Sequence, residues 1–185
     1  SGIGEEELIM SQSDNDRLSN IAYISLPDTM ERTIGEFEID PSILIPVEVI
    51  PGEEEWSIQN LSWEMIIAAM LKVLVHDPDN EYYSYYRDFV FAAKPGITEE
   101  LSKTGVEKAR ERDFETAEEV FLALQALIPE ETTPLVNLAL VYEERADAYD
   151  AANRTSSAES NKEKAHELYS QIFHDHPDDE NAHFN

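Results

Sequence analysis

A proline-terminated segment with helical spacing occurs twice in the C-terminal half of the chain, and this repetition limits the possible folds more than any other feature. The two segments are AEEVFLALQALIP, residues 117–129, and AHELYSQIFHDHP, residues 165–177. In each, an alanine lies 12 residues before the proline and an aromatic residue lies 8 before it. Similar helical segments at a fixed spacing are typical of repeat architectures, in which each unit packs mainly on its neighbours. We therefore expect stacked helix pairs.

Helical periodicity begins after Pro51-Gly52 and continues to the end of the chain. Capping residues and prolines predict six helices. The first runs from Ser57 or Asn60 to about His76, and the second from Glu81 to Ala93 after an Asp79 cap. The others begin at four sites with capping or proline signals: Thr98, Asp113-Phe114, Thr133-Pro134, and Ser156 in a capping box with Glu159.

Counted from Thr98 over 34 residues, one unit places apolar, small and aromatic residues at defined positions. These are Leu101, Gly105, Phe114, Ala117, Phe121 and Pro129, at positions 4, 8, 17, 20, 24 and 32. The spacing resembles that of the tetratricopeptide repeat, and a second unit from Thr132 continues it with Leu135, Ala139 and Tyr142. The resemblance implies a mainly α-helical, right-handed solenoid of antiparallel helix pairs, in which small residues let the two helices cross closely.

The second unit departs from the family in length. Tyr142 and Ala165 are 23 residues apart where the family has 9, so about 14 residues are inserted, close to four helical turns. We predict that Glu143–Ala152 extends the fifth helix and that Ala158–Lys164 lengthens the sixth, the alternative being a flexible loop. A third unit would start at Glu180 and stop at Asn185. We therefore expect the N-terminal part of a longer repeat protein, with Leu168, Ile172 and Phe173 only partly covered.

The predicted organisation has six segments. They are a flexible segment 1–20, an extended or β region 21–56, a degenerate repeat-like helix pair 57–97, a first repeat 98–131, a second repeat 132–179 with the insertion, and a truncated third repeat 180–185. In the second segment a hairpin is expected through Asp40-Pro41-Ser42, and Pro46 predicts an edge strand or a segment outside any sheet. We expect this region to pack on the helices between Trp56 and Phe91 as a cap, the alternative being the solenoid groove.

Charge excludes several partners. Forty acidic and thirteen basic residues give a net charge of −27, which repels nucleic acid and anionic membranes. The acidity indicates a well-solvated surface, while adaptation to salt and attraction to a basic partner remain alternatives. The most apolar stretch, Met65–Val75, is too short to span a membrane, and we expect a cytoplasmic protein.

No motif for catalysis or cofactor binding is present, and the chain has no cysteine. We expect neither an enzyme nor a cofactor. Six residues near the end suggest a metal site, namely His174, Asp175, His176, Asp178, Asp179 and His183. We interpret them as a polar helix end because neighbours two apart on a helix point to different faces. The aromatic residues between Tyr82 and Phe91 are interpreted as core.

The resemblance implies a groove that holds a peptide or a partner helix along the first helix of each repeat. By position, the candidates are Ser102, Val106, Ala109, Arg110, Val136, Asn137, Leu140 and Glu144. Asn137 matches the subclass that clamps a C-terminal carboxylate, whereas Ser102 and Val106 do not. The sequence thus predicts a scaffold or adaptor for a protein or peptide partner. The alternative is a structural subunit that assembles by repeat stacking without a separate ligand.

Overall fold

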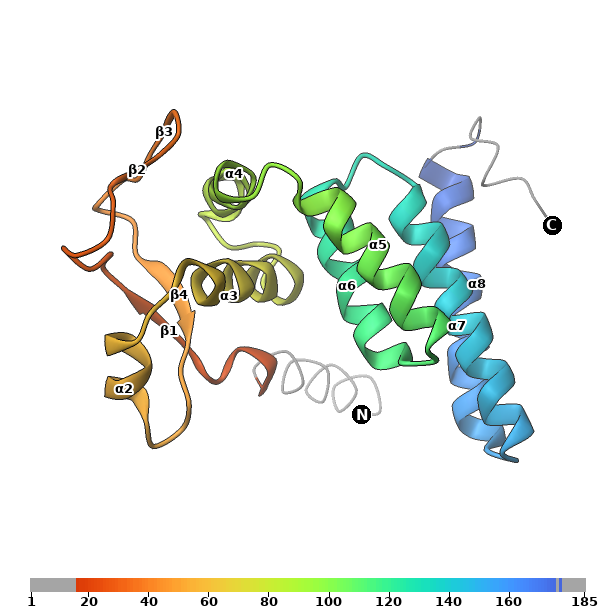
Figure 1. The fold of residues 1–185 in the computed structure, drawn as a ribbon. Coiled ribbons are helices and arrows are strands. Elements are labelled where there is room, and N and C mark those ends of the chain that lie inside the picture. The colour runs from red at the N-terminus through yellow and green to blue at the C-terminus, as the bar shows by residue number, and fades with distance from the viewer. Residues whose placement is uncertain (1–15, 176, 178–185) are drawn as a thin grey trace, which may run out of the picture. The chain divides into compact units, whose positions relative to one another are not determined.

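A computed structural model describes residues 16–175 and 177 of the chain, and the fold is mainly helical with two short two-stranded sheets near the start of the described residues. Two compact units, Ser1–Ile97 and Thr98–Asn185, divide the chain and are described separately. Figure 1 shows their elements. The predicted third repeat and most of the predicted flexible segment 1–20 lie outside the described residues. Of the helices in the described part, none is long and apolar enough to cross a membrane.

From residue 16 onward, the first unit contains four short strands in two antiparallel pairs. β1 (Ile21–Ile24) pairs with β4 (Ile45–Glu48), and β2 (Thr33–Ile34) pairs with β3 (Phe37–Glu38). The hairpin predicted through Asp40-Pro41-Ser42 is wrong, because β3 and β4 do not pair with each other. The chain does turn there, since the Asp40 carboxylate accepts hydrogen bonds from the backbone N–H and hydroxyl of Ser42 at 2.9 and 2.7 Å. Pro46 lies in β4, at the edge of a two-stranded sheet, as predicted.

Three helices follow. The helix predicted from Ser57 or Asn60 to His76 begins later, at Trp63, a separate short helix precedes it, and both predicted caps are wrong. α2 (Glu54–Gln59) ends before Asn60, and α3 (Trp63–His76) begins after Ser62, whose hydroxyl accepts a bond from the N–H of Met65. Ser57, fully buried in α2, accepts a hydrogen bond from the Ile50 N–H at 3.1 Å and donates one to the Glu53 carbonyl at 2.9 Å. Ser57 therefore lies inside α2 and is not its cap, but its hydroxyl links α2 to the segment that follows β4 and so helps to fix the chain reversal between them.

α4 (Tyr83–Ala93) begins two residues later than predicted. The side chain that accepts a hydrogen bond just before this helix is Asn80 and not the predicted Asp79: Asn80 Oδ1 accepts from the Tyr82 N–H at 2.8 Å. The interpretation of the following aromatics as core is confirmed for Tyr86 and Phe89, which are 1% and 0% exposed.

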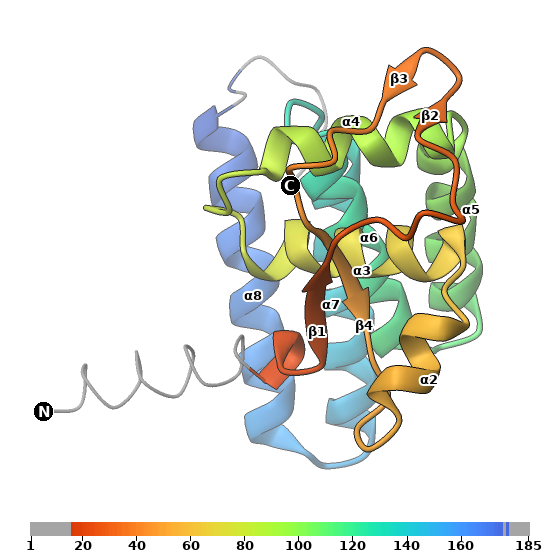
Figure 2. The ribbon, with the colours of Figure 1, turned by 90° about the vertical axis from the view of Figure 1, so that its left-hand side faces the viewer.

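The strands pack on the helices of their own unit, as predicted for this region. Figure 2 shows β4 lying against α3, and Ile45 and Val47 of β4 are fully buried. The Tyr86 hydroxyl donates a 2.8 Å bond to the Leu44 carbonyl, and Lys72 of α3 forms a 2.7 Å ion pair with Glu48. Two short strands have too few contacts for independent stability, so α3 and α4 supply the surface that stabilises them.

The described part of the second unit consists of four helices: α5 (Ile97–Arg110), α6 (Phe114–Leu127), α7 (Thr133–Ala151) and α8 (Thr155–Asp175). Asp113 caps α6 as predicted, accepting a bond from the Thr116 N–H at 3.2 Å, and Pro134 lies in the first turn of α7. The caps predicted at Thr98 and Ser156 are wrong, because both residues lie inside helices that begin one residue earlier. The prediction that the inserted residues extend the last two helices is confirmed.

The hydrophobic core of this unit is formed by residues of α5, α6, α7 and α8. Its buried centre consists of Ala117, Phe121, Leu124, Leu138, Val141, Tyr142 and Ala165. α5 crosses α6 so closely at Gly105 that a Cβ placed there would lie 2.7 Å from the Phe121 ring. This contact is the close crossing that the small residue predicted.

Coverage of the last helix differs from the expectation at one residue. Phe173 is 52% exposed and Leu168 is partly buried against the core, as predicted. Ile172 is fully buried, so the prediction of partial coverage is wrong there. Ile172 is seven residues after Ala165 and therefore shares the face of α8 that packs on the core.

Candidate partner-binding groove

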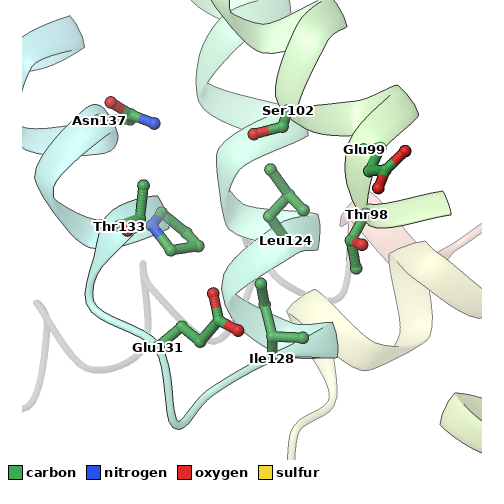
Figure 3. A pocket seen from close by; sticks show the side chains of 9 residues that line it. Thr98, Glu99, Ser102, Leu124, Ile128, Glu131, Thr133 and Asn137 are labelled. Atoms are coloured by element: carbon green, nitrogen blue, oxygen red, sulfur yellow. The ribbon is translucent and has the colours of Figure 1, made fainter. Parts of the chain in front are cut away.

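A hollow of about 250 Å³ lies within the second unit, where the first turns of α5 and α7 meet the end of α6. Figure 3 shows its lining. Nine residues surround it: Thr98, Glu99, Ser102, Leu124, Ile128, Glu131, Thr133, Pro134 and Asn137. They come from three helices and one loop, so the site exists only when α5, α6 and α7 are packed together.

Local sequence explains why the hollow forms at this end. α6 stops at its cap residue Ile128 before Pro129, and a short loop leads to Thr133 and Pro134 in the first turn of α7. A proline cannot continue the first helix and favours the start of the next one. The chain therefore reverses over few residues and leaves Leu124, which is 2% exposed, and Ile128 at the floor.

Two polar side chains face each other across the hollow. Ser102 of α5 and Asn137 of α7 point inward from opposite sides (Figure 3). Within the described part of the chain, neither side chain hydrogen-bonds to another residue. A hydroxyl and an amide both donate and accept hydrogen bonds, so this pair can bind the N–H and C=O groups of a peptide backbone.

Acidic side chains stand at the rim. Glu99 in the first turn of α5 and Glu131 in the loop are both exposed, and none of the nine lining residues is basic. Glu99 also lies where the helix dipole favours a negative charge, so it stabilises α5 as well as facing the hollow. The rim carries the charge that attracts a basic group.

Apolar side chains continue the same surface along both helices. Val106 is one turn after Ser102 and is 38% exposed, and Leu140 is one turn after Asn137 and is 40% exposed. Residues three or four apart share a helix face, so the hollow and these two side chains form one strip. We call this strip, made of the nine lining residues with Val106 and Leu140, the α5–α7 groove.

The other predicted candidates lie elsewhere. Ala109 packs against the hydrophobic core, and a small apolar side chain at that position contributes to the close packing of α5 instead of facing a ligand. Val136 is half-buried, while Arg110 and Glu144 are exposed outside the hollow. Sequence reasoning missed the floor and rim, although the short loop after Pro129 was a usable signal that the end of α6 meets the start of α7.

A polar network of Glu118, Arg145 and Asn161, the Arg145 network, ties α6, α7 and α8 together. Arg145 donates from Nη2 to Glu118 Oε2 at 3.0 Å and from Nε to Asn161 Oδ1 at 2.7 Å. The Arg145 and Glu118 side chains are only 15% and 19% exposed. Burial, together with the hydrogen bond to Glu118, raises the pKa of the neighbouring Tyr142. The network satisfies its charges internally, which is the arrangement of a structural tie.

Metal-binding residues do not assemble in the described part of the chain, where no group of three histidine or acidic side chains can hold an ion. His174 and Asp175 are exposed at the end of α8. The remaining members of the predicted cluster, His176, Asp178, Asp179 and His183, lie outside the described residues.

Comparisons with protein-family models, with curated proteins and with solved structures find no significant match to this chain.

Proposed function

We propose that the chain is a protein-interaction module of the tetratricopeptide-repeat type, a right-handed solenoid that holds an extended segment of a partner protein in the α5–α7 groove. The observation that carries this proposal is the hollow into which Ser102 and Asn137 point from facing helices (Figure 3). The repeat spacing of the sequence and the close crossing at Gly105 support it. Binding, with no catalytic step, is the whole of the proposed activity.

The groove has the features needed to recognise a peptide. Asn137 and Ser102 pair with the peptide backbone, and Leu124 and Ile128 receive an apolar side chain. A hollow of about 250 Å³ is smaller than most drug-sized ligand pockets, which fits one side chain of a longer segment. Val106 and Leu140 then contact the residues that follow it. Glu99 and Glu131 favour a basic residue at the end of the segment nearest the hollow.

The test begins with peptides selected from a random display library by the intact chain. Their dissociation constants are measured by calorimetry for the wild type, for Asn137→Ala and for Leu140→Asp. We expect at least about fivefold weaker binding for each, because removal of a contact at the centre of an interface costs at least about 1 kcal/mol. Ser102→Ala and Ser170→Ala are a matched pair, since Ser170 is exposed on α8.

Of the two serine variants, only Ser102→Ala should weaken peptide binding, and Ser170→Ala should bind as the wild type does. Selected peptides that bind all of these variants as tightly as the wild type would exclude the groove as the binding site.

The alternative proposal is a structural subunit that assembles by stacking, and the exposed Phe173 on α8 favours it. Sedimentation of the intact chain at several concentrations separates the two proposals. Self-association that Phe173→Ser abolishes would support stacking, whereas a monomer at all concentrations supports the interaction module.

A further inference from the structure

The first unit has a separate hollow of about 460 Å³ at the start of α4. Its lining combines tyrosine rings with polar and acidic groups: Tyr23, Ser42, Leu44, Asn80, Glu81, Tyr82 and Tyr86. Every one of these residues belongs to the first unit, so the hollow is independent of the α5–α7 groove.

The walls of the hollow are held by hydrogen bonds. Tyr86 is 1% exposed and forms the back wall, fixed by its 2.8 Å bond to the Leu44 carbonyl. The Tyr82 ring lies 6.1 Å from the Tyr86 ring, centroid to centroid. Asn80 bonds to the Tyr82 N–H and to the Asp77 carboxylate, which fixes the segment that carries Tyr82.

Two of the lining side chains are exposed to solvent and can contact a ligand. Tyr23 of β1 is 42% exposed and Leu44 is 44% exposed. The hollow therefore presents rigid aromatic and apolar surface that folding leaves half uncovered, with Tyr23 and Tyr82 supplied by different elements.

The electrostatic character of the hollow is negative. Glu81 lies in the lining, and no lining residue is basic. Hydrogen bonding to Glu81 and the charge of that carboxylate raise the pKa of Tyr82, with smaller contributions from burial and from Asp40. Burial raises the pKa of Tyr23, and the charge of Asp77 adds to it. An entering cation would therefore meet the Tyr23 and Tyr82 rings beside the carboxylate of Glu81.

We propose that this hollow binds the guanidinium group of an arginine side chain presented by an extended segment of a partner protein. Guanidinium is planar, stacks on tyrosine rings and is less strongly hydrated than an ammonium group, so it loses less on leaving water. Its N–H groups pair with a carboxylate such as that of Glu81. The net charge of −27 raises the rate at which a basic segment encounters the chain.

The test uses the acetylated and amidated tripeptide Gly-Arg-Gly with the intact chain. Two matched peptides replace arginine by citrulline, which has the same shape without the charge, or by lysine. Binding is followed by NMR through the backbone amide signals of Ser42, Leu44, Asn80 and Glu81 as peptide is added. We expect saturable shifts of these signals with the arginine peptide, and at least about threefold weaker binding of the other two.

Variants test the assignment to residues. Glu81→Gln and Tyr82→Leu should each weaken the arginine peptide by roughly threefold or more, because they remove a charge partner and a ring face. Glu31→Gln is the matched control, since Glu31 is exposed and outside the lining, and it should bind as the wild type does.

Three results would overturn the proposal. They are the absence of saturable shifts at millimolar peptide, equal binding of the citrulline or lysine peptide, and unchanged binding by both Glu81→Gln and Tyr82→Leu. None of these results bears on the α5–α7 groove, whose variants lie in the other unit.

Discussion

Replacement of Gly105 by alanine should destabilise the second unit, although the same change usually stabilises a helix. The added Cβ would lie 2.7 Å from both Cε1 and Cζ of Phe121 and 3.1 Å from Cε2. Carbon atoms in ordinary contact are about 3.5–4.0 Å apart, so the ring or one of the two helices has to move by about 1 Å.

The structure leaves the Phe121 ring little room to move. It is 1% exposed and lies in the core with Ala117, Leu124 and Leu138. Overpacking of such a core costs about 1–3 kcal/mol, and exchange of glycine for alanine inside a helix returns about 1 kcal/mol. The expected net loss is therefore up to about 2 kcal/mol of the free energy of unfolding.

The measurement is urea unfolding of the intact chain, followed by circular dichroism. Gly96→Ala is the matched control, because no atom lies within 4 Å of the position its Cβ would take. It should leave stability unchanged or raise it slightly. A double-mutant cycle with Phe121→Leu should show that Gly105→Ala is less harmful once the ring is gone. Stabilisation by Gly105→Ala equal to that of the control, or no coupling in the cycle, would refute the reasoning.

Three further predictions use the same unfolding measurement. Arg145→Met should lower the free energy of unfolding by about 1–3 kcal/mol, because it leaves Glu118 and Asn161 without their cationic partner. Lys162→Met is the control and should change stability little, because the lysine side chain in that ion pair is 56% exposed. Ser57→Ala should lower the free energy of unfolding by about 0.5–1.5 kcal/mol because the Ile50 N–H loses its acceptor, and an unchanged stability would show that water replaces it. Hydrogen bonds from the Thr116 side chain and backbone lower the pKa of Asp113. The contribution of Asp113 to stability is therefore present above the pKa of the unfolded carboxyl group and is lost as pH falls below about 4. Asp113→Asn should lose less stability on acidification than the wild type, and parallel curves of stability against pH would contradict this.

The helices of the second unit were predictable because their signals are local. Asp113 caps α6, and Pro134 marks the start of α7. The inserted residues 143–152 and 158–164 continue helices because their alanines favour helix and their number matches the helical seam. Ile172 was misjudged because its burial depends on the face of α8 that packs on the core.

The strands of the first unit were harder to predict in detail. Extended segments were evident from sequence, but β4 pairs with β1 across twenty intervening residues, and no local signal specifies that partner. The break between α2 and α3 was missed because Ser57, Asn60 and Ser62 are equally good capping residues by type, and only the structure shows that Ser62 caps α3.

The candidate groove was predictable only on the faces of single helices. Repeat position identified Ser102 and Asn137, which the structure places opposite each other. Leu124, Ile128 and Glu131 come from a third helix and its loop, and their approach depends on how three elements pack. Ala109, a candidate from the same repeat positions, packs against the core, because helical spacing alone does not separate a core contact from a groove contact.

The α7–α8 hairpin is a part of the fold whose length can vary independently of the rest. Its helices have 19 and 21 residues, against 14 each for α5 and α6. The small buried side chains Ala146 and Ala158 form its seam near the tip, and the chain turns at Asn153, where φ is 59°. Because such a seam repeats about every 3.5 residues, adding or removing seven residues per helix keeps the same face inward and changes the reach by about 10 Å. The length of the hairpin can therefore change in steps of two helical turns per helix. Each step alters the distance that the hairpin spans and leaves the groove at its base the same.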